Sequence, residues 1–292
     1  MPELPEVETV RRGLEPVLSG ARLARVRANR PDLRFPLPDG FVQRLMGAKI
    51  LRLERRAKYL LAPLDRGDTL VMHLGMTGRF EIAAPSSEPG GRAMRPGDFA
   101  REVKPDDKHA HVVFETEDGA VVTYYDPRRF GFMDLIATDR LDRHPWFATM
   151  GPEPLGEAFD AKTLVAAFNG RKQGPKTLLL DQKTVAGLGN IYVCEALHRA
   201  RISPFKPAGM IAGKRLGPLT TAIKAVLAEA VEVGGSSLKD FAAADGALGY
   251  FQHRFRVYDR EGQPCPTPGC KGVIAREVQA GRSTFFCPVC QV

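Results

Sequence analysis

Four cysteines near the carboxyl end limit the possible folds of this chain. They form two close pairs on either side of a short segment, at Cys265 and Cys270 and at Cys287 and Cys290. Tetrahedral Zn²⁺ is held by four thiolates in this way, with each pair on one tight turn. Between the pairs, residues 273–278 and 283–286 are rich in β-branched and aromatic residues and predict two strands of a hairpin. We therefore expect one structural zinc ion bound by all four cysteines.

A pair of disulfides is the alternative for these cysteines, and an intracellular setting disfavours it. The first pair has four residues between its members rather than the commoner two, which loosens one turn but still allows tetrahedral geometry. The fifth cysteine, Cys194, lies in a helical pattern and is expected to be a core residue.

Composition and charge set limits on the function. The 292 residues suffice for two domains with real cores, and 42 Lys and Arg against 34 Asp and Glu give a net charge of +8. That balance favours a polyanionic partner. The amino terminus lacks the apolar core of a signal peptide, and no apolar run approaches the ~18 residues of a membrane span. We expect a cytoplasmic protein with no membrane partner.

The amino terminus carries a potential nucleophile. Removal of Met1 would leave Pro2 as a free secondary amine, and roughly 10% of an α-amino group with a pKa of about 8 is neutral at pH 7. Pro5 suits the start of a helix running through residues 6–14, whose positive end would disfavour the protonated amine. Glu3 follows as a carboxylate able to move a proton there. A solvated, frayed terminus is the alternative.

The chain is patterned in three parts. Residues 21–133 read mainly as strands, with a hairpin signal at residues 112–125 and an exposed insertion rich in Pro, Gly and charge at 86–107. Little periodicity follows, and then a helical face over residues 219–231 that ends at a Gly-Gly pair. The predicted divisions are a β-sandwich domain over 1–133, a linker over 134–160, a helical domain over 161–255 and the zinc hairpin over 256–292.

Three further segments suit contact with DNA. Two glycines flank Leu188 before a helix start at Asn190, which leaves amide groups bare for a phosphate. The turn at 125–131 joins two arginines and an aromatic ring, and the turn at 73–78 carries Met76 between glycines. Apolar wedges with Arg fill the space left by an extruded base. An ordinary helical corner, a packed loop and a solvated charge pair are the alternatives.

These pieces together resemble the bacterial formamidopyrimidine-DNA glycosylases, base-excision repair enzymes that remove oxidised purines. The resemblance spans nearly the whole chain in order. Its motifs are Pro2–Thr9, Arg55–Leu60, His73–Met76, Asp126–Gly131, Gly187–Tyr192, Leu238–Phe241, Asp245–Phe251 and the cysteine hairpin.

The resemblance implies an α+β fold, with an N-terminal helix and β-sandwich, a helix-two-turn-helix domain and a zinc-finger hairpin. It also implies a bifunctional DNA glycosylase and abasic-site lyase that acts on damaged double-stranded DNA. On this basis Pro2 would attack the sugar C1′ and form a Schiff base, and β,δ-elimination would leave a one-nucleotide gap with 3′ and 5′ phosphates. Glu3 would be the general acid, Lys58 a phosphate contact and proton donor, and Arg282 a phosphate contact in the elimination.

The same resemblance assigns the DNA contacts. Met76, Arg128 and Phe130 would fill the void, with Arg128 reading the cytosine opposite the lesion. The remaining contacts would be His73, His109, Arg171 and Asn190, and the match at Arg171 is the loosest because its neighbourhood aligns poorly.

Other functions remain open from the sequence. An endonuclease VIII-like enzyme for oxidised pyrimidines usually begins Pro-Glu-Gly-Pro, whereas this chain has Leu4, and such enzymes tend to lack the full segment 245–251. A non-catalytic zinc-containing DNA-binding protein would not need Pro2, Glu3 and Lys58 together. An enzyme that uses an N-terminal Pro as a base on small keto acids would not need the duplex-binding segments. We expect the glycosylase for oxidised purines, acting as a monomer.

Overall fold

The computed structural model describes residues 2–83, 108–236 and 249–292. The insertion expected at 86–107, the motif at 238–241 and most of the motif at 245–251 lie outside the described residues. The chain divides into two compact units, each described here by itself. The first comprises Met1–Ala148 with Gly234–Tyr250, and the second comprises Thr149–Val233 with Phe251–Val292.

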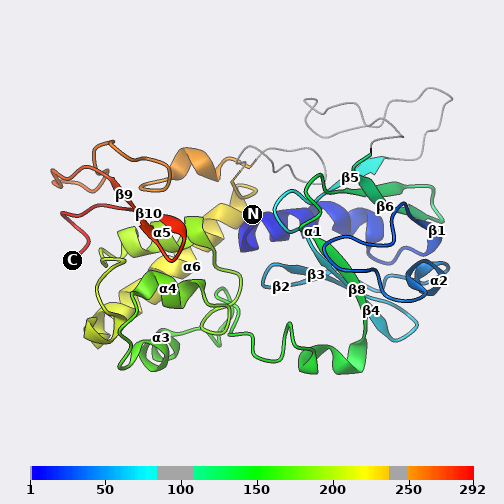
Figure 1. Ribbon diagram of the computed structural model, residues 1–292, viewed down its shortest axis with the longest axis horizontal. Helices are drawn as coiled ribbons and strands as arrows, with labels where there is room; N and C mark the ends of the chain where they lie inside the picture. Colours follow the sequence, from blue (N-terminus) through cyan, green and yellow to red (C-terminus); the bar gives the residue numbers. More distant parts are fainter. Residues whose placement is uncertain (1, 84–107, 237–248) are drawn as a thin grey trace. The chain divides into compact units, whose positions relative to one another are not determined.

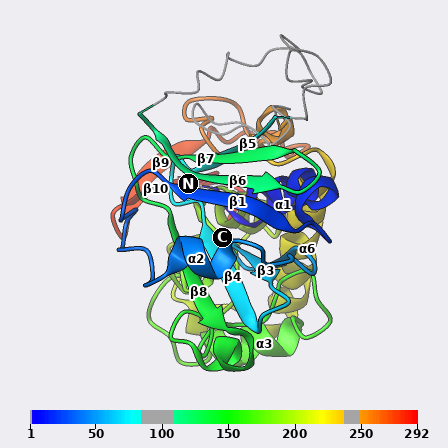
Figure 2. The same cartoon turned by 90° about the vertical axis from the view of Figure 1, so that its right-hand side faces the viewer.

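Two four-stranded antiparallel sheets form the first unit (Figures 1 and 2). One sheet has the order β1-β6-β7-β5 and the other β2-β3-β4-β8. The bounds are β1 Leu23–Ala28, β2 Glu54–Arg56, β3 Tyr59–Pro63, β4 Asp68–His73, β5 Arg79–Ala83, β6 Ala110–Thr116, β7 Val121–Tyr125 and β8 Phe132–Ala137. The predicted β-sandwich is therefore confirmed.

Helix α1 (Leu4–Leu18) contributes its apolar face to the core of this sandwich. Val7, Val10, Leu14 and Leu18 recur at helical spacing and are buried with residues from both sheets. The helix thus begins at Leu4, directly before the predicted first position Pro5, and extends beyond residue 14 to Leu18. A five-residue helix, α2 (Phe41–Leu45), packs against β1.

The hairpin predicted at 112–125 is formed by β6 and β7, with Val113 opposite Thr123. After it, β8 continues past residue 133, where the sequence analysis placed the start of a linker. The strand continues because it pairs with β4 over its whole length and because the side chains of Leu135 and Ile136 are buried. A 3₁₀ helix, η1 (Thr138–Arg143), follows.

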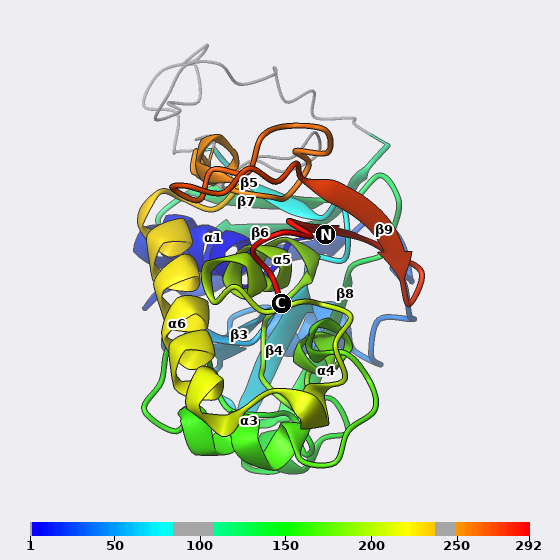
Figure 3. The same ribbon diagram turned by 90° about the vertical axis from the view of Figure 1, so that its left-hand side faces the viewer.

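The second unit is helical and carries the terminal hairpin (Figure 3). Helices α5 and α6 pack side by side around a core that includes Leu197, Ile223 and Val226. The bounds are α3 Ala161–Phe168, α4 Pro175–Leu180, α5 Asn190–Arg199, η2 Ala208–Met210, η3 Gly213–Arg215, α6 Leu216–Glu232, η4 Phe251–Arg254, β9 Ala275–Gln279 and β10 Arg282–Phe286. In the described parts of the chain, no helix is long and apolar enough to cross a membrane.

The segment Gly234–Tyr250 belongs to the first unit, although it lies inside the stretch 161–255 expected as the helical domain. Helix α6 ends as predicted before Gly234 and Gly235, which both adopt a left-handed backbone with φ of +77°. Its continuation is then hydrogen-bonded to α1, as described below. The predicted functional divisions of the chain remain a prediction, separate from these compact units.

Candidate active site and metal centre

Pro2 and Glu3 are buried where α1 begins. Glu3 is the residue before the helix, with extended backbone, and its N–H donates to Oε2 of Glu6 at 2.8 Å. This bond satisfies one backbone donor at the helix start and fixes the backbone that immediately follows Pro2. The position of Pro2 therefore depends on the Glu6 carboxylate.

The other oxygen of Glu6 binds a distant part of the first unit. Oε1 accepts hydrogen bonds from N–H and Oγ–H of Ser236, at 2.8 and 2.9 Å. Ser236 forms an isolated β-bridge with Tyr250, and a side chain on Gly249 would collide with the carbonyl oxygens of Gly234 and Gly235. Glu6 is 2% exposed, so this carboxylate is a buried junction between the helix start and the residues around Ser236.

Lys58 lies on a two-residue turn between β2 and β3, where Arg56 pairs with Tyr59. Ala57, the other turn residue, has φ of +53°, an unusual value for a residue with a Cβ. Arg55 holds the turn: its Nη1 donates to the carbonyl of Ala57 at 3.1 Å, and its Nε donates to Glu8 on α1 at 3.2 Å. The buried Lys58 turn is therefore attached to the helix that carries Pro2 and Glu3.

His73 ends β4, with its ring stacked on Phe132 at 5.0 Å and 9°. Burial, and then the charges of Lys58 and Arg34, lower its pKa from 6.5 to about 4. The ring is thus neutral at pH 7, and its Nδ1 accepts the N–H of Gly75 at 3.0 Å. The ring hydrogen must therefore be on Nε2, which makes Nε2 a hydrogen-bond donor.

A buried carboxylate organises the turn at 125–131. Asp126 accepts hydrogen bonds from the hydroxyls of Thr77 (2.5 Å) and Tyr124 (3.2 Å) and from the N–H of Gly131 (2.7 Å). Thr77 Oγ1 also accepts the N–H of Arg128 at 3.2 Å. These bonds tie the turn that carries Arg128 to the turn that carries Met76.

The three expected void-filling side chains are exposed at these turns. Met76 is 37% exposed and Phe130 is 41% exposed, although both are large and apolar. The Arg128 guanidinium lies over the Phe130 ring at 4.6 Å from its centroid, a cation–π geometry. His109, half-buried just before β6, accepts the N–H of Asp126 at its carbonyl (3.1 Å), which brings it to the same turn.

In the second unit, Asn190 is the first residue of α5, as predicted. Its Nδ2 donates to the carbonyl of Ser283 at 2.9 Å, and the same oxygen accepts from Nζ of Lys176 at 3.0 Å. Lys176 Nζ also lies 2.6 Å from Oγ1 of Thr284. Two donors therefore fix the residue that follows Arg282, while Arg282 itself is exposed at the start of β10.

A buried carboxylate fixes the chain that leads into the hairpin. Glu195, fully buried on α5, accepts backbone N–H groups from Arg256, Val257 and Tyr258 at 2.9–3.0 Å. Burial raises the pKa of this carboxyl group, and the three donors act in the opposite direction.

The four predicted cysteines meet at one point. Their Sγ atoms all lie within 4.8 Å of one another, with 3.7 Å between Cys265 and Cys290 and 3.6 Å between Cys270 and Cys287. Thiolates at ~2.3 Å from a tetrahedral zinc ion are about 3.8 Å apart, so the residues fit the metal. A Cβ on Gly272 would lie 2.6 Å from Sγ of Cys287, so the close approach requires glycine there. The cysteines are positioned to bind one zinc ion.

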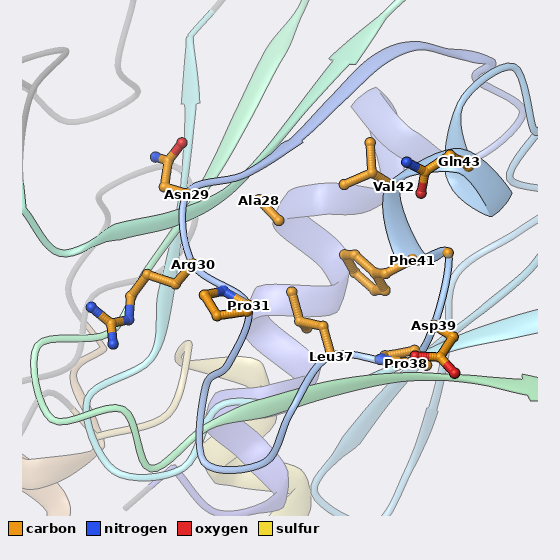
Figure 4. A pocket seen from close by; sticks show the side chains of 11 residues that line it. Ala28, Asn29, Arg30, Pro31, Leu37, Pro38, Asp39, Phe41, Val42 and Gln43 are labelled. Carbon is orange, nitrogen blue, oxygen red and sulfur yellow. The ribbon is translucent and has the colours of Figure 1, made fainter.

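Two further features in the described parts of the chain are a predicted DNA contact, Arg171, and a pocket. Arg171 is exposed after α3, and its carbonyl accepts the N–H of Gly209 at 2.9 Å. A pocket of about 450 Å³ in the first unit is lined by residues 28–31 and 37–43, and Figure 4 shows Pro31, Leu37 and Phe41 facing one another, with the Arg30 side chain pointing away. None of the predicted site residues lines this pocket.

Comparisons with known proteins identify the family. Residues 1–133 match the model of the formamidopyrimidine-DNA glycosylase N-terminal domain, residues 150–242 its H2TH domain, and residues 262–292 the zinc finger found in Fpg and isoleucyl-tRNA synthetase. The chain belongs to the formamidopyrimidine-DNA glycosylase family. It is therefore a DNA glycosylase with abasic-site lyase activity, and the predicted family, fold and zinc finger are confirmed.

Relatives and solved structures agree over the full length. The formamidopyrimidine-DNA glycosylase of Caulobacter sp. (strain K31) is 93% identical and that of Phenylobacterium zucineum is 71% identical, each with 100% of both chains covered. The MutM (Fpg) crystal structure from Thermus thermophilus is 40% identical with a TM-score of 0.82, covering 99% of this chain and 98% of that one. The Lactococcus lactis Fpg complex with abasic-site DNA is 34% identical with a TM-score of 0.84, covering 99% of each chain.

Four residues that position the groups of this glycosylase described above were not singled out from the sequence. Glu6, Arg55, Lys176 and Glu195 make the bonds that position Glu3, the Lys58 turn and the hairpin. Glu6 and Arg55 lie inside two of the motifs named above, and this position could have suggested that they support the neighbouring site residues. Lys176 is a single lysine in a helical stretch and offers no comparable signal.

Proposed function

We propose that this enzyme excises oxidised purines, including 8-oxoguanine and formamidopyrimidines, from double-stranded DNA through a Schiff base on Pro2. The observation that supports this most directly is the helix start, where Pro2 and Glu3 are buried and their backbone is fixed by Glu6. Removal of Met1 is part of the proposal, because only a free amine can attack the sugar.

In the proposed reaction the Pro2 nitrogen forms a bond to the sugar C1′, and the bond from C1′ to the base breaks. The Pro2 nitrogen loses its proton, and the base leaves with the electron pair and takes up a proton. Glu3, as general acid, protonates the ring oxygen of the sugar as the ring opens, which leaves an iminium. The iminium acidifies the neighbouring carbon, so loss of a proton there expels the 3′ phosphate and a second elimination expels the 5′ phosphate, giving a one-nucleotide gap. Water then hydrolyses the iminium and frees the Pro2 amine from the remaining sugar fragment.

Extruding a nucleotide costs a few kcal/mol, and phosphate contacts can offset that cost. We assign these contacts to Lys58, Arg282, Asn190 and His73, with His109 and Arg171 as further contacts. The neutral His73 ring suits a phosphate oxygen because its Nε2–H is a donor. Asn190 already donates to Ser283, so its second amide hydrogen would serve the DNA.

The void left by the extruded nucleotide would be filled by Met76, Arg128 and Phe130, with Arg128 contacting the opposite cytosine. Their exposure beside one another on turns held by Asp126 supports this role. We also propose that the enzyme acts as a monomer. We place it in the bacterial cytoplasm because the relatives named above are bacterial proteins.

Incision of duplexes that carry 8-oxoguanine opposite each normal base, run beside a thymine glycol duplex, tests the substrate class. We expect strong excision opposite cytosine and poor excision opposite adenine. Preference for thymine glycol would favour the pyrimidine-specific alternative instead.

Borohydride trapping on an abasic duplex tests the nucleophile. Pro2→Gly, or an extension before Pro2, should abolish or cripple base release and trapping, while Pro16→Ala on the exposed end of the same helix should leave both unchanged. Full excision by a protein with a blocked amino terminus would contradict the mechanism.

A further inference from the structure

His198 lies against the zinc cysteines, although it belongs to none of the motifs above. It is on α5, is 1% exposed, and places its Nε2 at 3.5 Å from Sγ of Cys265. The same Nε2 lies 3.3 Å from Oγ1 of Thr267, and that oxygen is 3.8 Å from Sγ of Cys290. One imidazole nitrogen thus lies among groups that contact two of the four metal ligands.

The direction of the bond to Cys265 follows from the chemistry of the partners. A thiolate that binds zinc has no hydrogen to give, so it can only accept. Nε2 carries a hydrogen in the imidazolium form and in one of the two neutral tautomers. The other tautomer would put the hydrogen on Nδ1, which is buried and has no hydrogen-bond partner among the described residues. The arrangement therefore favours an Nε2–H that donates to sulfur, whichever charge the ring has.

A donor has a clear physical effect on such a centre. Four thiolates around one Zn²⁺ carry a net charge of about −2, and each hydrogen bond to sulfur spreads part of that charge. The backbone N–H of Gly272 does this for Cys270, at 3.4 Å from its sulfur. His198 is the corresponding side-chain donor, and it comes from α5 rather than from the turns that carry the cysteines.

We propose that His198 is a positioning residue of the zinc centre, which donates Nε2–H to the Cys265 thiolate and slows loss of the metal. Thr267 extends the network. Its Oγ1 accepts part of the same Nε2–H bond, and its own hydroxyl hydrogen can be donated to Sγ of Cys290. This inference rests on zinc binding by the four cysteines and is independent of the base that the enzyme removes.

The test compares two variants of similar volume. His198→Gln keeps an amide donor close to the position of Nε2, whereas His198→Met has none. Zinc release from the purified, zinc-loaded protein to an excess of a colorimetric chelator is followed without DNA. We expect His198→Met to release zinc about tenfold faster than the unmodified protein, the lower end of the usual effect of removing an outer-sphere partner. His198→Gln should stay within about threefold.

Equal release from both variants and the unmodified protein would overturn the proposal. Equally fast release from both variants would also overturn it, because packing rather than the donor would then be responsible. Circular dichroism and the initial zinc content show whether each variant is folded and loaded. The proposed base excision is tested separately, since a variant can lose zinc faster while its freshly loaded form still incises DNA.

Discussion

The two ends of this chain hold their functional groups by different physical means. At the amino end, Pro2 and Glu3 precede a helix whose Val10 and Leu14 are buried in the apolar core of a sandwich. At the carboxyl end, Arg282 lies on a two-stranded hairpin, and Arg276 and Val278 of β9 are exposed. A two-stranded hairpin is at best marginally stable in water by itself. The hairpin therefore depends on the metal site and on hydrogen bonds from side chains of α4 and α5.

The two ends should therefore respond differently to substitution. In the first unit, changes to single polar groups should alter chemistry while the core keeps the fold. In the hairpin, loss of the metal ligands should remove structure as well as function. Single substitutions in each part can test this contrast.

Cys287→Ser should give the largest effect, because it removes a fully buried ligand from the metal site. We expect loss of zinc, unfolding of the hairpin and loss of incision, since binding energy of a structural zinc site is folding energy. Metal analysis and limited proteolysis check this, with Cys194→Ser as the cysteine control. A Cys287→Ser protein with full zinc content would show that three thiolates suffice.

Glu6→Gln should leave the fold in place and lower incision by about 100-fold, the cost of a misplaced reacting group. The amide nitrogen would face either the Glu3 N–H or the two Ser236 donors, so one contact must break. Single-turnover incision and binding to an abasic-site analogue separate rate from affinity, which should change less than threefold. Glu15→Gln, on the exposed face of the same helix, is the matched control. A weakened affinity with an unchanged rate would refute this account of Glu6.

Lys176→Met should lower incision by about tenfold without changing the salt dependence of DNA binding. Its Nζ is buried against Ser283 and Thr284, so it positions the hairpin and is not a phosphate contact. Arg282→Ala should instead weaken binding and incision and reduce the slope of log K against log salt by about 1. Lys183→Met, at an exposed position of the same unit, is the control. A reduced slope in Lys176→Met would place this lysine on the DNA.

His73 should make the stability of the first unit depend on pH. Its folded pKa of about 4 lies below the ordinary 6.5, so the unfolded state binds the proton first as the pH falls. Stability from this group is fully present above pH 6.5 and is lost as the pH falls towards 4, at up to about 1.4 kcal/mol per pH unit. Denaturant unfolding of the unmodified protein and of His73→Phe checks this. The two proteins should differ in how steeply their free energy of unfolding changes with pH below pH 6.5, and this difference should vanish above pH 7. A difference that persists above pH 7 would not come from the titration of His73.

Local patterns in the sequence predicted much of the fold. The apolar spacing of α1 and α6, the turn between β6 and β7 and the cysteine spacing each lie within one element or one hairpin. The start of α5 at Asn190 was likewise predicted from the glycines before it.

The longest-range contacts that position these groups could not be predicted, because they join residues far apart in the chain. Glu6 and Ser236 are 230 positions apart, and Lys176 and Ser283 are 107 apart. A carboxylate or a lysine in the sequence does not name its partner, since many surface positions would suit it equally well. The left-handed backbone of Ala57 had no signal either, because glycine is the residue expected there.

The hydrogen bonds around Asp126 bear on how a glycosylase could search a genome. Thr77, Tyr124 and Gly131 tie the turns that carry Met76, Arg128 and Phe130 to one another through Asp126. In the proposed void-filling role, turns that are already tied together lose little ordering entropy at each encounter with a duplex, so we expect the test of an undamaged base pair to cost little and to reverse quickly. Turns arranged in this way would suit a protein that must reject almost every site it meets.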